Sequence, residues 1–181
     1  MFNSVTHQLK LRRFLCKVLY CFRENVKERG IILSSFILFL YSIIPSLIIS
    51  ACILQLTELF APEIRATVGT AAGQSNLNWF PTIIFNPVIE SFLLALLVFT
   101  SLKLKFNVFF ICAIPAALLA CLHSIAQPIW GITVFWTFLL HSYAFQLNLT
   151  TGFIRAYLII VFAHALQNST ILIIFKLQLF S

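Results

Sequence analysis

The chain has 181 residues, of which 61% are hydrophobic and only 9% are charged, and its mean hydropathy is +1.00. Soluble domains carry about 25% charged residues, so this composition excludes them and indicates an integral membrane protein. The formal net charge is +7, and seven of the twelve Lys and Arg residues precede residue 30. A basic cluster beside an apolar chain favours anionic lipid headgroups as partners and argues against nucleic acid.

Residues 1–30 form a basic cytoplasmic or interfacial N-terminal segment. Its apolar residues recur at helical spacing between Leu11 and Phe22, which predicts an amphipathic helix lying on the membrane. A solvated basic tail that only sets the orientation of the chain is the alternative. The apolar run that follows, 31–56, is longer than the roughly 7 to 15 apolar residues of a secretory signal, so it predicts an uncleaved first span.

The remaining sequence predicts one membrane-embedded domain, 31–181, built as an all-α bundle of about five transmembrane helices. The long connection 57–78 is rich in small and polar residues and predicts an exposed or re-entrant loop. Basic residues in the short loops place the N-terminus in the cytoplasm, and we expect a bacterial inner membrane. The five apolar segments are 31–56, 79–102, 106–126, 129–147 and 154–179.

Ionisable residues inside these spans are the candidates for function, because each costs at least about 2.5 to 3.5 kcal/mol at the centre of a bilayer. They are Glu90, His123, His141 and His164. Asn168 follows His164 by four residues, so both side chains lie on one face of a helix. We expect His141 near the inner end of its span, close to water, in a structural role. The others also have structural alternatives. Glu90 could only hydrogen-bond to a neighbouring helix, His123 could be satisfied near a helix end, and the pair of His164 and Asn168 could serve packing between spans.

Taken together, these residue types suggest hydrolysis of a peptide bond within the membrane. Glu90 and His123 can activate a water molecule as a general base, and His164 with Asn168 can stabilise the developing oxyanion. Asn86 and Pro87 are typical of a helix N-cap and first helical residue, which predicts that Glu90 lies in the first full turn of its helix.

In three motifs the chain resembles the CAAX protease and bacteriocin-processing (CPBP) family of intramembrane proteases. That family's first motif has a Pro shortly before a Glu-Glu pair, then three residues and an Arg. The second motif is a His late in an apolar helix, and the third is His-x-x-x-Asn or Asp. The matching region spans about 80–172, and its residues are Pro87, Glu90, Ser91 and Ala95, then His123 in "ALLACLHS", then His164 and Asn168.

The resemblance implies an intramembrane endopeptidase with the catalytic residues Glu90, His123, His164 and Asn168. Its substrate is expected to be a membrane-associated or lipidated protein, or one with a sorting signal. Ser91 and Ala95 replace the family's second Glu and its Arg. Those two charges would compensate each other, so losing both leaves no stranded charge, and the resemblance implies an active but divergent member.

No metal or other cofactor is expected, since the chain has no HExxH motif. If a metal such as zinc is used, its ligands are expected to be Glu90, His123 and His164. The five cysteines show no pairing or metal-binding pattern and are assigned no chemistry. Two other functions stay open: a catalytically silent membrane adaptor or bacteriocin-immunity protein of the same fold, and a small transporter.

Overall fold

The computed structural model describes residues 20, 24, 26, 29–60, 78–126 and 128–177, and these contain five long helices and no strand. The predicted fold class, an all-α membrane bundle, is therefore confirmed. A short π-helix, η1, leads directly into the second of the long helices. The elements are α2 (Ile31–Phe60), η1 (Pro81–Phe85), α4 (Asn86–Lys103), α5 (Val108–Ala126), α6 (Pro128–Leu149) and α7 (Phe153–Lys176).

The apolar exterior of the bundle shows that the protein is integral to a membrane. The helix α2, the continuous helix η1–α4, α5 and α7 are each long and apolar enough to cross a bilayer. Their outward faces carry large apolar side chains, such as Ile32, Ile125 and Ile154, which are 83%, 81% and 72% exposed. Surfaces of this kind are stable only against lipid acyl chains.

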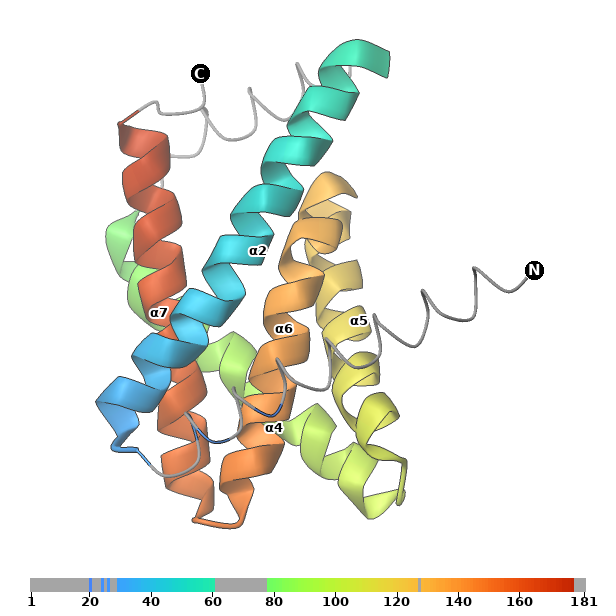
Figure 1. Ribbon diagram of the computed structural model, residues 1–181, viewed down its shortest axis with the longest axis vertical. Helices are drawn as coiled ribbons and strands as arrows, with labels where there is room; N and C mark the ends of the chain where they lie inside the picture. The colour runs from blue at the N-terminus through green and yellow to red at the C-terminus, as the bar shows by residue number, and fades with distance from the viewer. Residues whose placement is uncertain are drawn as a thin grey trace, which may run out of the picture.

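The helix α6 differs because it occupies the centre of the bundle. It contacts α2, α4, α5 and α7, so little of its surface has to face lipid. This position explains why α6 tolerates several polar residues, among them His141, Ser142 and Asn148, all of which are fully buried. Figure 1 shows α5 beside α6, and α4 passing behind α7 and α6.

Short connections fix the order of α4 to α7. The Asn107 side chain accepts a hydrogen bond from the Phe110 backbone N–H at 3.1 Å, a typical N-cap that starts α5. The turn between α6 and α7 ends at Gly152, whose φ of 125° is accessible mainly to glycine. Both turns lie at the same end of the bundle, the lower end in Figure 1.

The observed helix limits agree with the predicted spans to within a few residues, with one correction. Asn86 has φ −61° and ψ −48°, so it is helical, and no side chain caps the start of α4. The prediction that Asn86 is an N-cap is therefore wrong, because η1 supplies the preceding helical turn. Glu90 lies inside a longer helix that begins at Pro81.

Parts of two other predictions lie beyond what the structure describes. The amphipathic helix expected within 1–30 lies largely outside the described residues, and so do residues 61–77 of the expected loop. The first residues of that loop, Thr57–Phe60, belong to α2.

The helices are joined by an apolar core and by a few buried hydrogen bonds. Every long helix contributes fully buried apolar side chains, including Leu38, Leu94, Leu119, Phe138 and Ile159. In addition, the Gln167 side-chain amide on α7 donates to the Thr137 hydroxyl on α6 at 2.7 Å. That hydroxyl also bonds Ser46 of α2 at 3.1 Å. Such bonds set the rotation and depth of neighbouring helices in lipid, where apolar contacts alone are weakly directional.

Candidate functional site

The centre of the candidate site is the carboxylate of Glu90. Its Oε2 lies 3.5 Å from Nε2 of His123 and 3.5 Å from Nε2 of His164. The three side chains come from α4, α5 and α7, which the fold brings together (Figure 1). Three of the residues predicted from sequence therefore meet at one oxygen atom.

The contacts between Glu90 and the two histidines are loose. Hydrogen bonds between these atom types are normally about 2.7 to 3.2 Å long, so neither 3.5 Å contact is tight. The Oε2 atom is buried and has no hydrogen-bond partner in the described structure. Catalytic groups are often loosely placed before substrate binds and tighten in the reacting complex.

The backbone determines which nitrogen of His123 carries a proton. His123 Nδ1 lies 2.9 Å from the carbonyl oxygen of Leu119. A carbonyl oxygen can only accept, so Nδ1 must be the donor and carries a hydrogen. In the neutral ring Nε2 then carries no hydrogen, and its lone pair faces Glu90. A contact between that lone pair and a carboxylate oxygen is favourable only when one proton is shared between them.

His164 is the more enclosed of the two histidines. Its side chain is 6% exposed, compared with 23% for His123 and 24% for Glu90. The Phe138 ring of α6 packs against both imidazoles, with ring centroids 5.2 Å from His123 and 5.8 Å from His164. Glu90 and His123 are thus partly exposed, while His164 is the more deeply buried member of the group.

Asn168 lies one turn after His164, as predicted, and is anchored to the π-helix. Its side-chain Nδ2 donates to the carbonyl oxygen of Thr82 at 2.9 Å. An amide NH₂ group has two hydrogens, so this bond leaves the second N–H available for another acceptor. The bond also ties α7 to the turn that precedes Glu90.

His141 does not lie where the sequence analysis expected it. The expectation of a water-accessible residue near the end of its span is wrong, because the side chain is 0% exposed. The His141 ring lies 5.7 Å from that of His164, centroid to centroid, and neither of its nitrogens has a hydrogen-bond partner in the described structure. The signal that could have revealed its burial is the spacing of Phe138, His141 and Phe145, which share one face of α6.

A second contact from α7 also positions Glu90 and was not foreseen. The Tyr157 hydroxyl donates to the backbone carbonyl of Val88 at 2.9 Å. With the Asn168–Thr82 bond, it holds α7 against the segment that leads into Glu90. Every residue has a backbone carbonyl, so the sequence could not indicate that those of Thr82 and Val88 are the acceptors.

The two positions that depart from the family pattern point into the bundle. Ser91 and Ala95 are each 1% exposed, one turn apart on α4. The Ser91 hydroxyl is buried without a hydrogen-bond partner in the described structure. At these positions the chain places small side chains in the core beside the site.

Glu90, His123 and His164 are of residue types that can bind a metal ion. Among the residues that the structure describes, no group of three or more His, Cys, Asp and Glu side chains is arranged to hold a metal ion.

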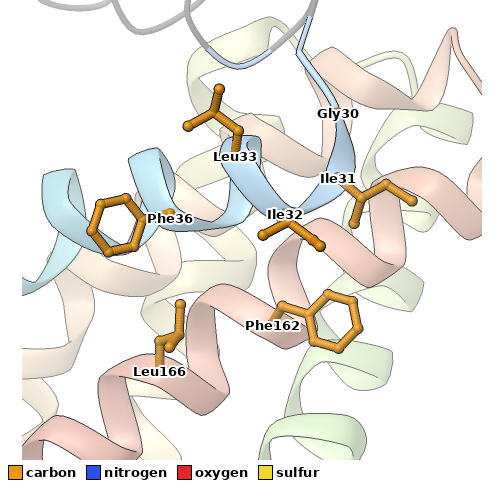
Figure 2. A pocket seen from close by; sticks show the side chains of 7 residues that line it. All are labelled: Gly30, Ile31, Ile32, Leu33, Phe36, Phe162 and Leu166. Atoms are coloured by element: carbon orange, nitrogen blue, oxygen red, sulfur yellow. The ribbon is translucent and has the colours of Figure 1, made fainter.

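An apolar groove lies on the lipid-facing side of the bundle, where the start of α2 crosses the middle of α7 (Figure 2). Phe162 and Leu166 line it, and they flank His164 by two residues on either side. Two residues correspond to about 200° of rotation around a helix, so the groove and His164 lie on opposite faces of α7. The groove has no polar or ionisable side chain among its lining residues, so it offers no group for catalysis. The lining residues are Gly30, Ile31, Ile32, Leu33, Phe36, Phe162 and Leu166.

Comparison with known proteins adds no family to this picture. Neither the family models nor the curated proteins nor the solved structures compared with the chain match it.

Proposed function

We propose that this integral membrane protein is an intramembrane endopeptidase of the glutamate-dependent kind. The observation that carries the proposal is the position of Glu90 Oε2, 3.5 Å from Nε2 of both His123 and His164. A carboxylate at membrane depth is costly, and one that faces two imidazoles has the composition of a general acid–base site. The resemblance of these residues to CPBP motifs suggests the same reaction.

Glu90 acts as the general base in the proposed reaction. It takes a proton from a water molecule as the water oxygen attacks the carbonyl carbon of the scissile peptide bond. The proton already shared by His123 and Glu90 remains on His123 Nε2, which keeps Glu90 ionised and able to accept. When the tetrahedral intermediate collapses, the carbon–nitrogen bond breaks and Glu90 passes its proton to the leaving amine.

His164 and Asn168 stabilise the oxyanion of that intermediate. His164 donates from Nε2–H, and Asn168 donates from the N–H that is not bonded to Thr82. Donors fixed by the protein in a region without bulk water are effective, and removal of one such donor typically costs about 10²- to 10³-fold in kcat. The burial of His164 supports this role, since it excludes water from the donor.

The proposed substrate is a membrane-associated protein, or one held at the membrane by a lipid or sorting signal. This class is supported by the position of Glu90 within a helix that is long and apolar enough to cross a bilayer. We further propose that the chain resides in a bacterial inner membrane with its N-terminus in the cytoplasm. The seven basic residues before residue 30 then meet anionic lipid headgroups.

Replacement of Glu90 tests the proposal directly. Glu90→Gln keeps the size and hydrogen-bonding reach of the side chain but cannot accept the proton, so processing should stop while the protein still accumulates in the membrane. The measurement compares the membrane proteomes of cells with the wild type, the variant, and Glu24→Gln as a matched control at an exposed glutamate. One or more uncleaved precursors should accumulate only with Glu90→Gln.

The same experiment separates the proposal from its alternative. The buried Ser91 and Ala95 favour a catalytically silent adaptor or immunity protein, because they remove the family's second Glu and its Arg. If Glu90→Gln at wild-type abundance changes no membrane protein, the peptidase proposal is rejected. A binding function of the same fold then becomes the better explanation.

A further inference from the structure

The buried imidazole of His141 has no part in the reaction proposed above, yet it lies against the site. It is carried by the central helix α6 and is 0% exposed. Neither Nδ1 nor Nε2 has a hydrogen-bond partner in the described structure. A neutral imidazole always has one N–H donor and one acceptor nitrogen, and leaving both unsatisfied in a buried place is unfavourable.

His164 has a matching unsatisfied atom. Its Nε2 faces Glu90, while its Nδ1 is buried without a hydrogen-bond partner in the same part of the structure. To donate from Nε2 to an oxyanion, a neutral His164 must carry its proton on Nε2. Its Nδ1 is then an acceptor, and this tautomer is favoured only if a donor reaches Nδ1.

One water molecule between the two rings would satisfy Nδ1 of His164 and one of the two nitrogens of His141. The ring centroids are 5.7 Å apart with an interplanar angle of 58°, so neither ring stacks flat on the other. Two hydrogen bonds of about 2.8 Å each let one water join nitrogen atoms up to about 5.6 Å apart. Nitrogens that face each other from rings with centroids 5.7 Å apart lie within this reach. A buried water needs at least two polar partners, and the two imidazoles provide them.

We propose that His141 is a positioning residue that fixes the tautomer of His164 through a buried bridging water. The water donates to Nδ1 of His164 and accepts from, or donates to, a nitrogen of His141. His164 is thereby held with its proton on Nε2, directed at Glu90 and at the oxyanion position. The catalytic consequence rests on the proposed peptidase function, whereas the tautomer and the water bridge do not.

Nitrogen NMR of the full-length protein in lipid bilayers tests the bridge without any substrate. The chain has only four histidines, so labelling of the histidine ring nitrogens gives a spectrum simple enough to assign with single-residue variants. In the wild type we expect His164 to be protonated on Nε2 and bare on Nδ1, with magnetisation transfer from water protons to both rings. Absence of that transfer, or a proton on Nδ1 of His164, would overturn the proposal.

Variants at His141 separate a hydrogen-bonding role from a packing role. His141→Phe fills the space but cannot bind water, so His164 should lose its single tautomer. His141→Gln keeps an N–H donor and should restore it. Phe145→Leu, one turn further along α6 and equally buried, is the packing control and should leave the His164 tautomer unchanged. An unaltered His164 spectrum in His141→Phe would reject the bridge even if every variant is active.

Activity then tests the catalytic consequence separately. With a processed substrate in hand, His141→Phe should lower kcat about tenfold or more, as loss of a supporting hydrogen bond does for metal-bound histidines, and should leave KM unchanged. His141→Gln should recover most of this loss. If the NMR result is as expected but Glu90→Gln still cleaves the substrate, the proposed peptidase mechanism is rejected and the water bridge is retained. If kcat is unaffected by His141→Phe, the tautomer of His164 has no catalytic consequence and that part of the proposal is rejected.

Discussion

At the scale of single residues, the Leu119 carbonyl has a large effect on the candidate site. By requiring a proton on Nδ1 of His123, it leaves a bare Nε2 opposite Glu90. The contact between these two side chains is then stable only with one shared proton, so they behave as a single acid–base unit. His164 is not constrained in this way by any backbone carbonyl in the described structure, which is why its orientation depends on its other neighbours.

The two histidines that contact Glu90 should both be essential. His123→Ala removes the partner of the shared proton and His164→Ala removes an oxyanion donor, so each should lower the rate of processing by about 100-fold or more. The measurement is the rate of precursor cleavage in membranes with matched amounts of each variant. His7→Ala, in the N-terminal segment, serves as the control and should cleave normally. Full activity in either of the first two variants would contradict the proposed site.

Metal removal provides an independent check on the same residues. Because Glu90 itself is the proposed base, treatment of the purified protein with a strong chelator should leave cleavage unchanged. A loss of activity that added zinc restores would instead assign Glu90, His123 and His164 as ligands. Metal content of the purified protein, measured by mass spectrometry, would have to agree with that result.

At the scale of helices, the position of His123 depends on how closely α5 and α6 approach. Gly131 of α6 makes this approach possible, because a Cβ atom there would lie 2.5 Å from the carbonyl oxygen of Ala120 and closer still to Ser124 Oγ. Small residues at helix crossings commonly allow such contacts in membranes. Ala120 and Ser124 flank His123 in α5, so any separation of the two helices would also displace that imidazole.

Gly131→Ala should therefore destabilise the bundle and weaken the site together. Overpacking of this kind costs about 1 to 3 kcal/mol, which should appear as a lower Tm of the purified protein in detergent and a slower cleavage rate. Gly30→Ala is the matched control, because a Cβ at Gly30 meets nothing within 4 Å. Equal Tm values for the two variants would show that α5 and α6 can separate without cost.

The π-helix η1 has a comparable role for Glu90. It continues α4 backwards to Pro81 and presents the Thr82 carbonyl to Asn168. Pro81 has no backbone N–H, so at the start of the helix it leaves no donor unsatisfied. Irregular turns of this kind are frequent at functional sites, and here the turn links the Asn168 side chain to the segment that holds Glu90.

At the scale of the whole molecule, the five helices predict a definite orientation. With an odd number of spans, the start of α2 and the end of α7 lie on opposite sides of the membrane. The turns at Leu104–Asn107 and Thr150–Gly152 then share a side with the basic N-terminus, and the end of α7 lies on the other side. Lys103, Lys105 and Arg155 beside these two turns agree with a cytoplasmic location.

Reporter fusions test this orientation. Alkaline phosphatase fused after residue 106 or 151 should be inactive, because it remains in the cytoplasm, whereas a fusion after residue 177 should be active. A fluorescent protein that matures only in the cytoplasm should give the opposite pattern at the same three positions. Phosphatase activity at residue 106 would reverse the assignment of sides.

The sequence by itself determined the class of the protein, the approximate limits of its spans and the residues to consider for function. Hydropathy is a sum over neighbouring residues, so it can be read along the chain without knowledge of the fold. For the same reason Glu90, His123 and His164 stood out as ionisable groups in apolar segments. Their roles were inferred from residue type and from the family resemblance.

Only the tertiary structure decided which of these residues meet. Whether Glu90 faces both histidines depends on the rotation and crossing of α4, α5 and α7, which are set by contacts between residues far apart in the chain. The burial of His141 depends on α6 being the central helix, whereas its position near the inner end of the span had suggested that it lies close to water. The Thr82 and Val88 carbonyls that hold α7 against the Glu90 segment are backbone groups, present at every position, and only packing selects the ones that matter.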